Sequence, residues 1–90
     1  MLVSGTFTAV DQVSAPIATL DGATVVLSGT FDGWVSVEVS CDGAGARYVS
    51  AGTLVGPGPQ LVSCFGSTLI RLKCVKHTSG TIYYDIVSAD

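Results

Sequence analysis

The sequence predicts an all-β fold: an antiparallel β-sandwich, or a jelly-roll or Ig-like barrel, of about eight short strands in one domain spanning residues 1–90. Three observations predict it. Stretches rich in Val, Thr, Ile, Leu and Tyr recur about every ten residues, and Gly, Pro or Asp-Gly separates them. Between these breaks, apolar and polar residues alternate with a period of two, and no long window has a helical period.

Eight segments have the composition of strands, and we expect strands at residues 5–10, 16–20, 24–29, 34–41, 48–54, 60–65, 68–77 and 81–87. The clearest alternation is in 34–41, where one face carries Val35, Val37, Val39 and Cys41 and the other carries Ser36, Glu38 and Ser40. The segment 68–77 alternates similarly, with Ile70, Leu72 and Cys74 on one face and Arg71 and Lys73 on the other. Both are predicted to be half-buried strands.

Turn residues separate these segments. Asp-Gly pairs at 21–22, 32–33 and 42–43 predict tight turns, because Asp-Gly tolerates positive φ angles. The Gly-Pro-Gly-Pro run at 56–59 predicts an exposed connection, and 78–80 is expected to close the last hairpin. Calcium loops are disfavoured, since the alternating oxygen ligands that they need are missing.

Composition and charge favour an assembly protein. Hydrophobic residues make up 48% of the chain and charged residues 12%, the latter about half of what a soluble domain usually carries. A net charge of −3 argues against nucleic-acid and membrane partners, which require a basic face. The charge is −5 before Arg47 and +2 from Arg47 onward. This division suits subunits that pack an acidic face against a basic face.

No constellation predicts catalysis, a cofactor or a metal site. His77 is the one histidine and is expected to be a solvated residue beside a turn. Three cysteines, at positions 41, 64 and 74, show no metal-ligand spacing, and Cys74 is expected to be a small buried hydrophobe. The start of the sequence does not resemble a secretory signal, so we expect folding in a reducing cytoplasm and no disulfide framework.

Strand alternation predicts which residues could form an interface. Trp34 lies opposite the Val35 face, Leu69 and Val75 lie on the charged face of their strand, and one of Tyr83 and Tyr84 must leave the core. Arg71 and Lys73 are expected to meet acidic side chains of another copy. The candidate interface residues are Trp34, Glu38, Asp42, Leu69, Arg71, Lys73, Val75 and Tyr83.

One part of the chain resembles small structural proteins of tailed bacteriophages. The resemblance begins with Ser28-Gly29-Thr30-Phe31-Asp32-Gly33-Trp34 and the alternating strand that follows to Cys41. It continues through Asp42-Gly43-Ala44-Gly45, the aromatic-led strand Tyr48-Val49-Ser50-Ala51-Gly52 and the later Leu69-Ile70-Arg71-Leu72-Lys73. The resemblance implies a β-sandwich virion protein of the capsid cement, or decoration, type. It also implies partners among the major capsid protein or other virion proteins, a homo-oligomer with a trimer favoured, and localisation in the virion after synthesis in the host cytoplasm.

Two alternatives stay open. One is a neck, tail or fibre component of the same class of particle. The other is an Ig-like or carbohydrate-binding module, which predicts Trp34 open to solvent among polar groups, whereas the cement role predicts Trp34 beneath a neighbouring subunit. An enzyme is not expected.

Overall fold

The computed structural model describes residues 2–40, 47–62 and 68–88, which form eight strands and no helix. The strands are β1 (Leu2–Phe7), β2 (Ile17–Thr19), β3 (Ala23–Ser28), β4 (Phe31–Ser40), β5 (Val49–Leu54), β6 (Gly58–Val62), β7 (Thr68–Gly80) and β8 (Ile82–Ser88). One antiparallel sheet has the order β1-β8-β3-β6 and the other has the order β2-β7-β4-β5. The predicted all-β sandwich is confirmed.

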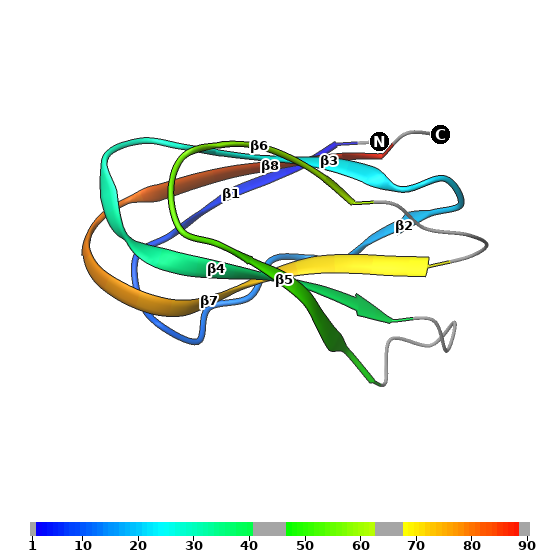
Figure 1. Ribbon diagram of the computed structural model, residues 1–90, viewed down its shortest axis with the longest axis horizontal. Coiled ribbons are helices and arrows are strands. Elements are labelled where there is room, and N and C mark those ends of the chain that lie inside the picture. The colour runs from blue at the N-terminus through cyan, green and yellow to red at the C-terminus, as the bar shows by residue number, and fades with distance from the viewer. Residues whose placement is uncertain (1, 41–46, 63–67, 89–90) are drawn as a thin grey trace.

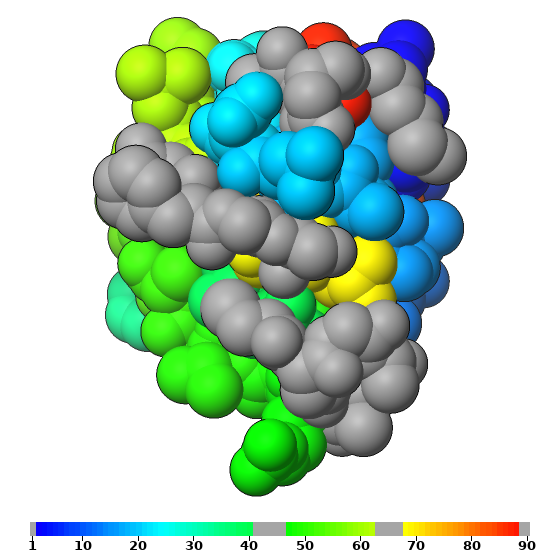
Figure 2. Space-filling view, turned by 90° about the vertical axis from the view of Figure 1, so that its right-hand side faces the viewer, coloured from blue at the N-terminus to red at the C-terminus, as the bar shows by residue number. Residues whose placement is uncertain are grey.

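The two sheets form two layers, with β1, β8, β3 and β6 in one and β2, β7, β4 and β5 in the other (Figure 1). Inward side chains of both layers make the core, and the largest fully buried ones include Phe7, Leu27, Ile70, Leu72 and Ile86. The edge strands β5 and β6 lie on the same side of the sandwich, where Figure 2 shows green β5 below yellow-green β6. Each layer therefore has one face in the core and one outer face.

The inner faces follow the predicted alternation. Val35 and Val37 are buried, Val39 packs against the core, and Cys74 is fully buried beside Leu72 as predicted. Tyr83 and Tyr84 point to opposite faces: Tyr84 is buried and stacks on Phe7 with ring centroids 4.6 Å apart. The prediction for Cys41 lies outside the described residues, as do those for Cys64, Asp42 and the turn at 42–43.

The predicted turn at Asp32-Gly33 is wrong, because both residues lie inside β4. The chain turns earlier, at Gly29, which has a φ of 100°. Gly33 sits at a register shift between β4 and β7, where a Cβ would come within 2.5 Å of the Lys76 carbonyl oxygen. Glycine is needed there for the close approach of two strands at a β-bulge, and not for a turn.

The first strand and β7 also differ from the prediction. The first strand is Leu2–Phe7 and not 5–10, because residues 9–11 form a turn in which Asp11 has a φ of 69°. Residues 78–80 belong to β7, which pairs with β4 as far as Gly80. His77 therefore lies within a strand and is half-buried, with its Nε2 2.6 Å from the carbonyl oxygen of Gly80.

The edges of the sheets are irregular. In the 56–59 run, Pro57 stays in the connection, but β6 starts at Gly58 and includes Pro59, which an edge strand tolerates. Strand β5 pairs with β4 across a register shift next to Gly52, and β2 has three residues. The predicted turn at 21–22 is confirmed: the Thr19 hydroxyl donates to the Gly22 carbonyl oxygen at 2.6 Å and accepts from the Gly22 amide at 3.0 Å. In the described part of the chain, no helix is long and apolar enough to cross a membrane.

Candidate functional site

The outer side of β7 and β4 carries most of the candidate residues, and we call it the cationic face. In the strand register Arg71 lies opposite Glu38, Lys73 opposite Ser36, Leu69 opposite Ser40 and Lys76 opposite Trp34. An isolated bridge places Val13 beside Lys73 on the other side of β7. The members of the face are Val13, Asp32, Trp34, Ser36, Glu38, Ser40, Leu69, Arg71, Lys73, Val75 and Lys76.

Glu38 and Arg71 form an ion pair within the chain. The Arg71 Nε donates to Glu38 Oε1 at 2.8 Å, and both side chains are partly shielded from solvent. The Arg71 guanidinium also lies over the Tyr48 ring, 3.8 Å from its centroid. We expected Arg71 and Glu38 to meet between copies, but cross-strand pairing brings them together in one molecule. A partner that used either charge would have to compete with this arrangement.

Trp34 is 44% exposed at one end of the cationic face. The Lys76 ammonium lies over its ring, 4.6 Å from the centroid. Such a contact contributes roughly 0.5–1 kcal/mol at an exposed site and holds the ring against the sheet. Trp34 is thus open to solvent at its rim while one of its flat faces is occupied by a cation.

Lys73 is the cation at the middle of this face. It lies on β7 between Val13 and Ser36 and is half-buried. Among the described residues it makes no ion pair and no ring contact, in contrast with Arg71 and Lys76. Because Lys73 has no counter-charge among the described residues, it is the best available point on this face for an acidic group from outside.

The structure divides the candidate residues between two surfaces. It brings Glu38, Arg71, Lys73 and Leu69 together at the centre of the cationic face, with Trp34 and Val75 at one end. Tyr83 lies on β8, in the other sheet, and is exposed at the opposite surface of the sandwich. Asp42 lies outside the described residues.

The outer side of the β1-β8-β3-β6 sheet is a second candidate surface that sequence reasoning missed, except for Tyr83. Cross-strand register arranges its side chains in rows, and one row runs through Leu2, Val87, Thr24 and Leu61 across all four strands. We call this surface the apolar face, and its members are Leu2, Ser4, Thr6, Thr24, Val26, Ser28, Pro59, Leu61, Tyr83, Asp85 and Val87.

The apolar face exposes four large hydrophobic side chains: Leu2 and Val87 are adjacent, Thr24 separates them from Leu61, and Tyr83 lies two rows from Val87. Leu61 is 75% exposed and Leu2 60%, and Tyr83 and Val87 are also exposed. The described members include no Lys, Arg or His. The one charged member is Asp85, next to Ser4 and Val26 in the middle row, and its Oδ1 accepts a hydrogen bond from the Ser4 hydroxyl at 2.6 Å. Neighbouring exposed apolar residues of this kind commonly mark a contact site for another protein.

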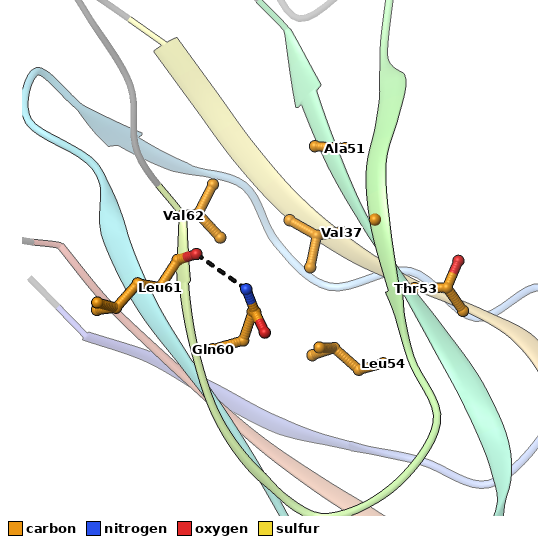
Figure 3. Close-up of a pocket in the computed structure, with 8 residues that line it drawn as sticks. Val37, Ala51, Thr53, Leu54, Gln60, Leu61 and Val62 are labelled. Carbon is orange, nitrogen blue, oxygen red and sulfur yellow. Dashed lines mark hydrogen bonds between the residues drawn. The ribbon is translucent and has the colours of Figure 1, made fainter.

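A cavity of about 260 Å³ opens between the edge strands β5 and β6 (Figure 3). Its lining is mostly aliphatic: Val37, Leu54 and Val62 point into it, whereas Leu61 points away from it. The Gln60 amide, which donates to the Leu61 carbonyl oxygen at 3.2 Å, is the most polar side chain of the lining. None of the lining residues is an acid or a base, so the cavity offers no group for proton transfer.

Reactive side chains are not gathered anywhere in the described chain. No group of three or more His, Cys, Asp or Glu residues there is placed to hold a metal ion. Burial raises the pKa of the Cys74 thiol, and the nearby Asp11 charge adds to this effect. A raised pKa keeps the thiol protonated and unreactive, which suits a packing role.

Comparison of this chain with protein families, with curated proteins and with solved structures finds no match. The two outer faces are the features of the described chain that suggest a function.

Proposed function

We propose that this chain is a structural protein of a phage particle, of the capsid cement type, that binds neighbouring shell proteins through its apolar face. The observation that carries the proposal is the row across four adjacent strands in which Leu2, Val87 and Leu61 are exposed and only Thr24 is polar, with a single carboxylate among the described residues of the face. The resemblance of the segment around Trp34 to small structural proteins of tailed bacteriophages is the reason for proposing a phage particle.

The size of the apolar face suggests how it would act. Four strands about 4.8 Å apart, each with five or six residues at about 3.4 Å, give a face of roughly 400 Å². A stable standard interface buries about 800 Å² on each partner. One apolar face thus supports a weak contact, and a cement protein would gain its effect from many copies acting on one shell.

The proposal is tested on particles made by the genome that encodes this chain. Mass spectrometry should find the chain in purified particles at a fixed ratio to the shell protein. In a rebinding assay with particles that lack the chain, Leu61→Lys should bind at least about tenfold more weakly than the native chain, because it places a charge in the contact.

Val49→Lys is the matched control for this assay. Val49 is similarly exposed but lies on β5, in the other sheet, so its substitution should leave binding unchanged. A chain absent from the particles, or a Leu61→Lys variant that binds like the native chain, would contradict the proposal.

The exposed rim of Trp34 favours one second candidate, a carbohydrate-binding module. Against it, Lys76 covers one face of Trp34 and Arg71 covers one face of Tyr48, so neither ring is fully free for sugar stacking. Titration with a panel of oligosaccharides, followed by Trp34 fluorescence, separates the two. A saturable change that is lost in Trp34→Ala would favour the sugar-binding function.

A further inference from the structure

We propose that copies of this chain pack head to tail, with the apolar face of one copy on the cationic face of the next and Asp85 opposite Lys73. This inference rests on the proposed structural role and adds the contact by which copies meet.

Asp85 opposes a symmetric contact between two apolar faces. It occupies the middle row of the face, flanked by Ser4 on β1 and Val26 on β3. A two-fold axis through the middle of the face would bring the Asp85 carboxylates of both copies close together and remove both from water. Two like charges in such a setting repel, and neither would gain a counter-charge.

The cationic face offers a counter-charge for Asp85. Arg71 is paired with Glu38, and Lys76 rests on Trp34, but Lys73 makes no comparable contact within the described chain. With Arg71, Lys73 and Lys76 against Glu38 and Asp32, that face is positive by one charge, whereas the apolar face carries a single negative charge. The two faces are therefore complementary in sign, and the centre of each holds one charge suited to the other.

One apolar side chain lies beside each of the two charges. Val13, 49% exposed, lies beside Lys73, and Val26 lies beside Asp85. When the faces meet, these side chains exclude water around the new ion pair and strengthen it. The same contact covers Leu61 and Tyr83, which are among the most exposed hydrophobic residues of the described chain.

The placement of the two faces determines the form of the assembly. They lie on opposite outer sides of the sandwich, one on each layer (Figure 1). A contact between unlike faces leaves one free face of each kind at the ends of the assembly, so copies add as an open column. The end copy of such a column keeps its apolar face free, and this is the face that meets the shell. With sheets about 10 Å apart within and between copies, each added copy lengthens a column by about 20 Å.

Sedimentation velocity of the full chain and its charge-reversal variants tests the inference. The native chain should self-associate as its concentration rises and dissociate in about 1 M salt, where the Debye length is about 3 Å. Asp85→Lys and Lys73→Asp should each weaken association by at least about tenfold, because each variant opposes two like charges. An equal mixture of the two variants should associate again, since each then presents the counter-charge that the other needs.

Matched controls separate this contact from general charge effects. Asp21→Lys makes the same change in charge as Asp85→Lys but in an exposed turn, and it should associate like the native chain. Thermal unfolding of every variant shows whether it is folded. A native chain that stays monomeric at high concentration would overturn the inference.

A Lys73→Asp variant that is folded and associates like the native chain would also overturn it, and would indicate contact between two apolar faces. These outcomes are independent of the particle-rebinding assay. A monomeric chain whose Leu61→Lys variant loses particle binding would refute head-to-tail packing and leave the cement role standing.

Discussion

The two outer faces of this sandwich use charge in different ways. On the cationic face, Arg71 is paired with Glu38 and Lys76 rests on Trp34, so most charges have partners within the chain. On the apolar face, Leu2, Leu61 and Val87 are exposed around a single carboxylate. The face with more charge therefore has most of its charges paired within the chain, whereas the face with little charge exposes apolar side chains that a partner would cover.

The largest expected effect on stability comes from Tyr84, whose ring packs beneath the apolar face on the core side of the sheet. Tyr84 stacks on Phe7 and is almost fully buried beneath that sheet. We expect Tyr84→Ala to lower the free energy of unfolding by about 3–5 kcal/mol, since it leaves a large cavity. Tyr84→Phe keeps the ring and should cost less than about 1 kcal/mol. Urea unfolding measures both, and equal losses would show that the hydroxyl, and not the stacked ring, supports the sheet.

A smaller effect on stability is expected when one carboxylate of each face is neutralised. Glu38→Gln removes the counter-charge of Arg71 and should cost about 1 kcal/mol, because the pair is partly buried. Asp85→Asn keeps an acceptor for the Ser4 hydroxyl and should change stability by less than about 0.5 kcal/mol. If Asp85→Asn proved the more costly substitution, Asp85 would have a structural role that the comparison does not assign to it.

The smallest effect is expected at alkaline pH, where one titrating group lies beneath each face. Burial raises the pKa of Cys74 above its ordinary value of 9.0 and that of Tyr84 above 10.0. Above pH 9 the unfolded chain loses protons that the folded chain keeps, so stability is full below this pH and falls as the pH rises through the folded-state values. Cys74→Ala should remove the earlier part of the fall and Tyr84→Phe the later part, as measured by thermal unfolding across this pH range. A fall of equal size in the doubly substituted chain would assign the effect to other groups.

The fold could be predicted from the sequence because alternation and turn residues are local signals. The eight strands, the inward faces of β4 and β7 and the turn at Asp21-Gly22 follow from neighbouring residues alone. The predicted turn at Asp32-Gly33 is wrong for a physical reason, because the same dipeptide suits both a tight turn and a bulge where two strands come close.

The apolar face could not be predicted, because it joins residues from four strands that are not consecutive in the chain. Leu2, Leu61 and Val87 become neighbours only through the order β1-β8-β3-β6. A weak signal exists in consecutive apolar residues such as Val25-Val26 and Ile86-Val87, which place apolar side chains on both sides of a strand. The ion pair of Glu38 and Arg71 could not be predicted either. Alternation shows which side chains of a strand share a face, but not which residues lie opposite each other on neighbouring strands.

The irregular edges of the sheets have a consequence for any crowded assembly of this chain. Pro59 lacks an amide hydrogen, the shift at Gly52 bends β5, and β2 is too short to template a long strand. Hydrogen bonding from sheet to sheet is thereby discouraged at three of the four edges that the described strands provide. Copies held at high local density would thus be joined through side chains and would be able to come apart again, instead of fusing into a continuous fibril.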